Sequence, residues 1–219
     1  MMPMRNFYWA VAAFLTVLAA VSPFMDIAVS RFFYVNGSFL LHSGFLNNVI
    51  SLYLPVILVG TAAGIFVVWL WDVVCCRKES VSVTTRVMLL TTGSMILGPG
   101  LIVNGLLKSF WGRARPSDVD IFDGDKSFSA PWVISDQCSW DCSFVSGHTA
   151  AAFWTVSLAL LAPEKYRAAA VFSALCFGCL VGLGRIAQGA HFFSDVYFSA
   201  LIMIILISVL HAYLKKHKI

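Results

Sequence analysis

Charge is what this sequence has least of. Of its 219 residues, 12% are charged and 59% are hydrophobic, whereas soluble domains carry about 25% charged residues. A composition this poor in charge argues against an ordinary soluble domain and indicates an integral membrane protein. The net charge is only +4, and the basic residues form no run except in the C-terminal tail. We therefore expect no nucleic-acid partner.

The chain also lacks signs of division into domains or of a metal site. It has no Ser/Gly-rich linker and no internal repeat, so we expect a single domain over residues 1–219. The stretch from Asp118 to Lys126 resembles a calcium-binding loop, but Phe122 and Ser129 stand where an EF-hand needs an oxygen ligand and a glutamate. We interpret it as a solvated acidic loop.

Long apolar segments are abundant, and most reach the roughly 20 residues that a membrane-spanning helix needs. The first segment has Arg5 before it and so resembles a secretory signal, but its apolar core is longer than is usual for one. The sequence predicts an all-α, polytopic membrane protein with six transmembrane helices. These are Phe7–Met25, Val49–Trp71, Val87–Leu107, Phe144–Ala162, Ala168–Gly184 and Val196–Leu214.

Six spans place both termini on one side of the membrane. The larger share of the 15 Lys and Arg residues falls on that side, for example Arg77, Lys78, Lys215 and Lys216. The positive-inside rule therefore predicts cytoplasmic termini. The opposite side carries a large outer loop at about residues 108–147.

Basic residues on the outer side are grouped in a way that suits a phosphate. Lys108 and Arg115 flank the start of the outer loop, and Arg185 lies at the outer end of the fifth segment. Arg offers a planar fork of donors and Lys a point charge. Pro116 disfavours helix at Arg115. We predict that Lys108, Arg115 and Arg185 converge on one phosphate.

Histidines complete this pattern. Ser146, Gly147 and His148 begin the fourth segment, where a helix N-terminus offers free backbone N–H groups to an anion. His191 and Asp195 are neighbours on one helical face, so Asp195 can fix the tautomer of His191. This arrangement predicts His191 as a nucleophile, Asp195 as its orienting partner and His148 as the acid that protonates a leaving alkoxide.

Lys108-x6-Arg115-Pro116, Ser146-Gly147-His148 and Arg185-x5-His191-x3-Asp195 together resemble the three-part signature of the type 2 phosphatidic acid phosphatase superfamily. The resemblance implies a metal-independent phosphatase without a cofactor, in which His191 becomes phosphorylated. It implies that His148 and Asp195 assist catalysis, and that the phosphate is bound by Lys108, Arg115, Ser146, Gly147 and Arg185. Val145 and Gly184 depart from the usual Pro and Ser at these positions.

The residues around the motifs are similar to those of bacterial lipid A phosphatases, and more to the 4′ branch than to the 1-phosphatase branch. This resemblance implies a lipid phosphate substrate, a bacterial inner-membrane location and a periplasmic active site. The alternatives are hydrolysis of undecaprenyl diphosphate or phosphatidylglycerol phosphate, phosphate transfer to another lipid, and a transporter with Arg185, His191 and Asp195 as a proton relay. The oligomeric state stays open.

A few further residues carry expectations. Cys138 and Cys142 lie in the outer loop just before Ser146, and an oxidising periplasm would favour a disulfide between them over two free thiols. Arg113 lies between motif positions, and its role stays open between the site and lipid headgroups. Asn104 is expected to make an interhelical hydrogen bond. An acidic group in the outer loop is expected to stand over the site and meet a sugar, namely Asp118, Asp120, Asp123 and Asp125.

Overall fold

The computed structural model of the protein describes residues 20–75 and 78–217. Long apolar helices dominate these residues, because a helix satisfies its own backbone hydrogen bonds in a hydrocarbon environment. Four of them are long and apolar enough to cross a membrane: Phe45–Val74, Val83–Phe110, Glu164–Ala187 and Phe193–Lys216. They confirm the second, third, fifth and sixth predicted segments as helices, each extended by a few residues.

Two of these long helices are composites. Phe45–Val74 consists of α2 (Phe45–Asn48), the π-helix η1 (Val49–Tyr53) and α3 (Leu54–Val74). Val83–Phe110 begins within α4 (Lys78–Met88) and continues through the π-helices η2 (Leu89–Gly93) and η3 (Ile96–Leu107) to α5 (Lys108–Phe110). The last two are α8 (Glu164–Ala187) and α9 (Phe193–Lys216).

The predicted count of six spanning helices is not confirmed. Most of the first predicted segment, Phe7–Met25, lies outside the described residues, although residues 20–33 are helical. The fourth, Phe144–Ala162, forms two short helices, α6 (Gly147–Phe153) and α7 (Thr155–Ala159). Trp154, between them, is completely buried and donates from its indole nitrogen to the Thr91 carbonyl at 2.7 Å.

Small side chains explain why α6 occupies the interior. It packs against α3, η3, α8 and α9, and Ala150 and Ala152 are fully buried there. On α8, a Cβ at Gly178 would lie 2.8 Å from the Phe153 ring, and one at Gly182 would lie 2.5 Å from Val196. Residues without side chains therefore allow the helices to approach closely, and α6 is positioned from several sides.

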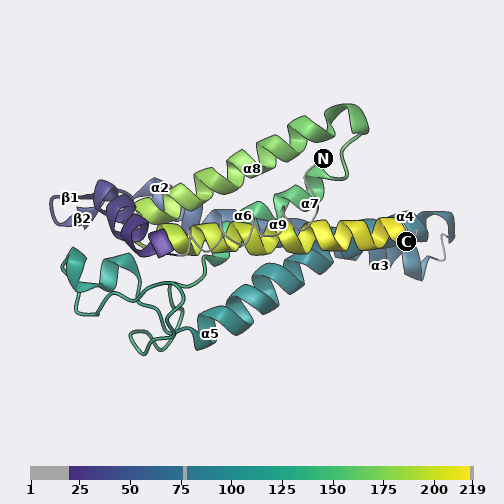
Figure 1. Cartoon of the computed structure of the whole chain (residues 1–219). Coiled ribbons are helices and arrows are strands. Elements are labelled where there is room, and N and C mark those ends of the chain that lie inside the picture. The colour runs from purple at the N-terminus through teal and green to yellow at the C-terminus, as the bar shows by residue number, and fades with distance from the viewer. Residues whose placement is uncertain (1–19, 76–77, 218–219) are drawn as a thin grey trace, which may run out of the picture.

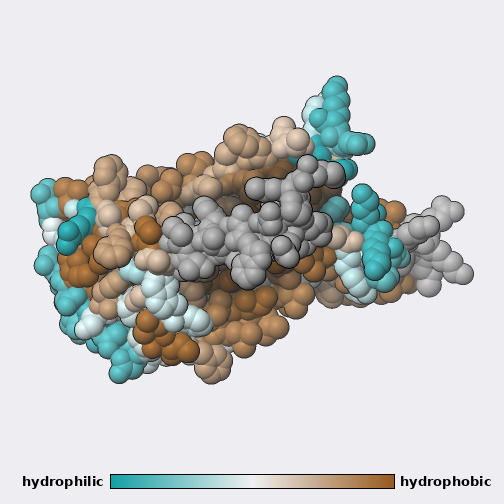
Figure 2. Space-filling model, in the orientation of Figure 1, coloured by the Kyte–Doolittle hydropathy of each residue, from teal (hydrophilic) through white to brown (hydrophobic). Residues whose placement is uncertain are grey.

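The outer surface fits a lipid environment. Figure 2 shows hydrophobic side chains over the middle of the long helices and hydrophilic ones gathered toward the two ends. Large apolar side chains of α3 such as Ile57 and Val67 are about three-fifths exposed. Water would penalise such a belt, whereas hydrocarbon chains cover it.

The irregular segments gather at one end of the helices (Figure 1). There the hairpin β1 (Tyr34–Val35) and β2 (Ser38–Phe39), with strands paired antiparallel, lies with the loop between α5 and α6. This loop contains two 3-10 turns, η4 (Pro116–Asp118) and η5 (Asp120–Phe122). Ser117 donates to the Gly189 carbonyl and Leu41 to the Ala187 carbonyl, at 2.9 Å each. These bonds tie the loop and the hairpin to the segment between α8 and α9.

Candidate active site

The three basic residues of the predicted phosphate site lie at the end of the molecule that carries the loops. Lys108 opens α5, Arg185 lies in the last turn of α8, and Arg115 follows the helix in an extended conformation. The backbone leaves the helix before Arg115, as Pro116 predicts. Three separate elements thus deliver these cations.

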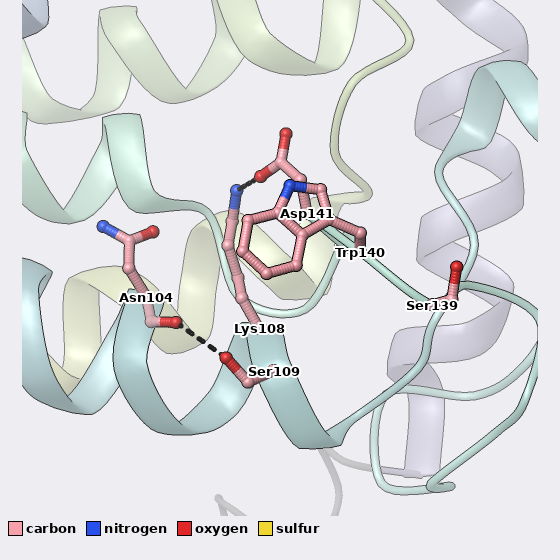
Figure 3. A pocket seen from close by; sticks show the side chains of 6 residues that line it. All are labelled: Asn104, Lys108, Ser109, Ser139, Trp140 and Asp141. Carbon is pink, nitrogen blue, oxygen red and sulfur yellow. Dashed lines mark hydrogen bonds and ion pairs between the residues drawn. The ribbon is translucent and has the colours of Figure 1, made fainter.

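Asp141, which sequence reasoning did not single out, joins two of them. Its carboxylate makes ion pairs with both Lys108 and Arg115, and Arg115 Nη2 also donates to the Asp141 carbonyl at 2.9 Å. Figure 3 shows the Lys108 ammonium group directed at this carboxylate. Burial raises the pKa of Asp141, but the two ion pairs outweigh it, so the pKa lies below its usual range.

Arg185 is held from the other side. Its Nη1 donates to Ser51 Oγ and to Gln188 Oε1, at 2.7 Å each. Ser51 comes from the π-helix η1, so this irregular turn contributes directly to the site. The Nε atom of Arg185 is buried and has no hydrogen-bond partner in the described part of the chain. The guanidinium therefore keeps an unused donor.

His191 is completely buried, with one ring nitrogen held and the other unpaired. Nδ1 lies 2.8 Å from the Ser143 carbonyl oxygen, which only accepts, so Nδ1 carries the proton. Nε2 has no hydrogen-bond partner among the described residues, and in this tautomer it keeps its lone pair. Burial, together with the charges of Arg185 and Lys108, lowers the pKa of His191 to about 3. The imidazole is therefore neutral at physiological pH.

Asp195 serves several partners besides His191. One carboxylate oxygen accepts from the Phe192 N–H at 2.7 Å and from Ser143 Oγ at 2.5 Å, and lies 3.8 Å from His191 Nδ1. The short hydrogen bond of His191 Nδ1 is therefore made to the Ser143 carbonyl oxygen and not to Asp195. Asp195 caps α9 and fixes Ser143, so that it orients His191 largely through its neighbours.

Arg113 proves to be the central buried cation of this region. It is 1% exposed and makes ion pairs with Asp195 at 2.6 Å and with Asp26 at 2.7 Å. Its guanidinium also lies 4.3 Å from the centre of the Phe192 ring. Sequence reasoning left its role open. Asp26 was the available signal, because an acidic group next to an apolar segment needs a cation.

His148 faces the site from α6. Its Nε2 lies 3.1 Å from the Ser51 carbonyl oxygen, which must accept the Nε2 proton. Nδ1 is then the nitrogen available for proton exchange. The same residue of η1 therefore holds Arg185 through its hydroxyl and His148 through its carbonyl.

Ser146 and Gly147 have different roles at the start of α6. The Ser146 hydroxyl accepts from the Thr149 N–H at 3.3 Å and from its hydroxyl at 2.8 Å, so it caps the helix. A Cβ on Gly147 would lie 2.8 Å from Asn104 Oδ1. Gly147 therefore admits Asn104, whose amide donates to the Pro99 carbonyl at 2.7 Å within its own helix and not, as predicted, to another helix.

Packing accounts for the two departures from the family pattern. A Cβ on Gly184 would lie 2.6 Å from Ile50 Cδ1, so glycine lets α8 approach η1, which carries Ser51. Val145 is completely buried and belongs to the main apolar core. Neither position carries a polar group toward the site.

Two adjoining pockets define the accessible part of the site. One, of about 300 Å³, is lined by Arg115, Arg185, His148, Asp141 and Ala190, together with His42, Asn47, Ser51, Ser117 and Gln188. The other, of about 230 Å³, brings in Lys108 and Gly147 and is also lined by Asp141 and His148. The predicted cations thus surround Asp141 and His148, while His191 lies next to the wall at Ala190.

The acidic segment between Asp118 and Asp125 packs beside the hairpin. Val119 and Phe122 are buried with Phe39 and Phe192 in a small second core, and Asp123 accepts from the Tyr34 hydroxyl at 2.6 Å. The carboxylate that lines the pockets is Asp141. Cys138 and Cys142, which flank it, are joined by a disulfide with their Cα atoms 5.6 Å apart.

In this membrane protein a neutral buried imidazole lies beside a cluster of cations at the end of a bundle of apolar helices, an arrangement that suits the binding of a phosphate. The chain belongs to the PAP2 superfamily, whose family model matches residues 87–219. It is similar to the lipid A 4′-phosphatase of Francisella tularensis subsp. novicida, with 44% identity over 56% of this chain and 55% of that protein. It is 32% identical to the lipid A 4′-phosphatase of Rhizobium leguminosarum, over 67% of this chain and 64% of that protein.

A lipid A 4′-phosphatase of Rhizobium etli is 34% identical over 59% of this chain and 52% of its own length. The chain thus matches between about half and two thirds of the length of each of these relatives. No solved structure matches it.

Proposed function

We propose that this protein is a phosphatase that removes the 4′-phosphate of lipid A at the periplasmic face of a bacterial inner membrane. It acts through a phosphohistidine on His191 and uses neither a metal ion nor a cofactor. The observation that carries this proposal is the buried Nε2 of His191, which keeps its lone pair and has no hydrogen-bond partner among the described residues.

The first step forms a bond from His191 Nε2 to phosphorus and breaks the bond to the sugar oxygen. Nδ1 of His191 keeps its proton on the Ser143 carbonyl, so the charge that develops on the ring is stabilised there. Lys108, Arg115 and Arg185 offset the negative charge on the equatorial oxygens, which is most of what phosphoryl transfer requires. His148 acts in its imidazolium form, which the negative charge of the bound phosphate favours. Its Nε2 keeps a proton on the Ser51 carbonyl, and its Nδ1 gives the other proton to the leaving oxygen.

The second step releases the phosphate. His148, now neutral, takes a proton from water as the water oxygen attacks phosphorus and the bond to His191 breaks. Inorganic phosphate leaves, His191 returns to its neutral tautomer, and His148 regains the proton that it needs for the next turnover. Ser51 holds His148 through both steps by the bond to its carbonyl.

The orientation of the molecule supports a periplasmic site. The disulfide of Cys138 and Cys142 lies at the loop end, which carries the candidate site, and disulfides persist in oxidising compartments. Lys215 and Lys216 at the end of α9 lie at the opposite end (Figure 1), where the positive-inside rule expects the cytoplasm. We propose six transmembrane helices in total, with both termini cytoplasmic.

The placement of the site supports a lipid substrate. The cations lie at the ends of apolar helices, so a phosphate must arrive at headgroup level, where a soluble substrate has no advantage. The relatives named above are lipid A 4′-phosphatases, and the PAP2 family model covers residues 87–219, which include the candidate site residues from Lys108 to Asp195.

Expression in a bacterium with bis-phosphorylated lipid A tests the substrate, with His191→Ala as the matched inactive control. We expect mass spectra in which lipid A has lost one phosphate from the distal sugar only when the wild-type chain is present. The purified chain should retain its activity in EDTA.

Loss of the reducing-end phosphate would overturn the proposed position. Unchanged lipid A combined with hydrolysis of undecaprenyl diphosphate or phosphatidylglycerol phosphate would overturn the substrate. Transfer of the phosphate to another lipid, with no inorganic phosphate released, would replace hydrolysis by phosphotransfer.

A further inference from the structure

The most unusual contact in the site is an anion that belongs to the chain itself. The carboxylate of Asp141 bridges Lys108 and Arg115, two of the three cations assigned above to the substrate phosphate. A carboxylate and a phosphate compete for the same donors, because both present oxygens that carry negative charge. The two cannot occupy these donors fully at the same time.

We propose that Asp141 is an internal competitor for the phosphate subsite, whose carboxylate occupies Lys108 and Arg115 until a substrate phosphate displaces it. This inference rests on the proposed function, since it takes Lys108 and Arg115 as phosphate ligands. Each anionic ligand must replace this competitor, so only ligands that are strongly attracted to the cations occupy the site.

The surroundings of Asp141 allow this displacement. Its side chain is 52% exposed, whereas that of Lys108 is 10% exposed, so the carboxylate can leave without unpacking the core. Trp140, which directly precedes Asp141, is 88% exposed. A pocket of about 450 Å³ beside them, lined by Asn104, Lys108, Ser109, Ser139, Trp140 and Asp141, offers space for the carboxylate (Figure 3).

The backbone at Asp141 stays in place while the side chain moves. Arg115 Nη2 donates to the Asp141 carbonyl oxygen as well as to its carboxylate. The disulfide joins the residues on either side, Cys138 and Cys142. Asp141 has a left-handed conformation with φ of 49°, which Asn adopts as readily as Asp. An Asn at this position therefore removes the charge and keeps the loop geometry.

Charge decides which ligands overcome this competition. Displacing Asp141 removes one negative charge from between Lys108 and Arg115, and this cost is the same for every ligand that takes its place. A phosphomonoester dianion is attracted to the cations more strongly than the monoanion of a phosphodiester, so it offsets the cost more readily. Asp141 therefore lowers the affinity for both ligands by a similar factor, and the monoester remains the tighter ligand.

Calorimetric titration of the purified full-length chain in detergent at pH 8 tests this proposal, with inorganic phosphate and dimethyl phosphate as probes. Asp141→Asn should bind phosphate about fivefold or more tightly than wild type, and its affinity for dimethyl phosphate should rise by a similar factor. Asp136→Asn is the matched control, because this exposed residue of the same loop makes no ion pair with Lys108 or Arg115 in the described structure.

Equal or weaker phosphate binding by Asp141→Asn would overturn the proposal, and so would an equal gain in Asp136→Asn, which would indicate a long-range charge effect. A gain for only one of the two probes would overturn the competition, because a competitor for a shared subsite acts on both. If neither wild type nor either variant binds phosphate, the anion site itself is overturned, and the proposed function with it. If wild type binds phosphate but Asp141→Asn binds it no more tightly, this proposal fails and the proposed function still stands.

Discussion

In the proposed mechanism, single nitrogen atoms decide the chemistry of this site. His191 and His148 each have one ring nitrogen fixed on a backbone carbonyl, of Ser143 and Ser51 respectively. Because a carbonyl only accepts, each bond places a proton on that nitrogen and leaves the other nitrogen for the proposed reaction. The proposed roles of nucleophile and acid therefore depend on backbone groups as much as on the partner Asp195.

Replacement of His191 by Ala should reduce turnover by about 10³-fold or more and abolish covalent labelling with phosphate. His148→Ala should still become labelled when the leaving group is activated and needs no proton, as in p-nitrophenyl phosphate. Acid-quenched gels with a radioactive substrate provide the measurement. Labelling of the His191 variant at the wild-type level would assign the nucleophile to another residue.

Acid should destabilise the folded protein through the same histidine. The pKa of His191 is about 3 in the folded state and about 6.5 in an unfolded chain, so the unfolded state binds more protons between these values. Stability is complete above pH 6.5 and decreases as the pH falls toward 3. His191→Gln should show a shallower fall in Tm in detergent between pH 6.5 and pH 4. Parallel curves for the two proteins would contradict this assignment.

Arg113 should matter for stability before it matters for chemistry. Arg113→Met leaves the buried carboxylates of Asp26 and Asp195 without their cation, which costs about 3–5 kcal/mol when one partner of a buried pair is removed. Thermal unfolding in detergent should show a large loss for this variant, and little change for Arg31→Met, at an exposed position. Similar Tm values for the two variants would refute the structural role of Arg113.

At this scale, sequence reasoning could single out residues whose spacing has a meaning. Motif spacing and helix ends pointed to Lys108, Arg115, Arg185 and His148, which line two adjoining pockets, and their roles in binding and catalysis stay predictions. Asp141 and Arg113 were not identified, because their contacts depend on how a long irregular loop folds back on the helices. The hydrophobic periodicity of a sequence does not predict the course of such a loop.

At the scale of elements, π-helical turns explain why polar groups reach the site from apolar helices. η1 supplies Ser51, whose hydroxyl and carbonyl hold Arg185 and His148. Pro99 within η3 lacks an N–H, and its carbonyl accepts from Asn104. Such turns frequently mark functional sites, but the apolar periodicity of the sequence does not reveal them.

The fourth predicted segment shows a related limit. Hydropathy predicts one continuous helix over Phe144–Ala162, whereas the structure divides this segment into α6 and α7 and packs it against the other helices. Burial by protein and burial by lipid select the same apolar residues. The abundance of Ala in α6 and the Gly residues that face it on α8 distinguish the two cases only once the packing is known.

The loop before α6 should be supported by its disulfide. Cys138→Ser should lower the free energy of unfolding by about 2 kcal/mol and modestly reduce activity, because the closed loop ends just before the Ser146 cap. Mass spectrometry of the non-reduced protein should show one disulfide between Cys138 and Cys142. Unfolding measurements in detergent should show the loss of stability in Cys138→Ser. The control is Cys179→Ser, which replaces an exposed free cysteine. Two free thiols at Cys138 and Cys142 would refute it.

For the molecule as a whole, the two ends of the helices should face different compartments. In variants with a single cysteine, Cys75 should be protected from an impermeant maleimide in spheroplasts, and a cysteine introduced at Asp125 should react. Cys75 is exposed at the end of α3, and Asp125 is exposed in the outer loop. The reverse pattern would place the site in the cytoplasm.

The buried bonds of Asp26 have a consequence for synthesis. Its carboxylate accepts from Arg113 and from both the backbone and the hydroxyl of Ser194, so an early residue depends on two that the ribosome adds much later. Until α9 emerges, Asp26 carries a charge without its complete set of partners. A nascent chain that stops before Ser194 therefore lacks two of the hydrogen bonds of Asp26, and the buried cluster that holds Arg113 is completed only when the start of α9 has been made.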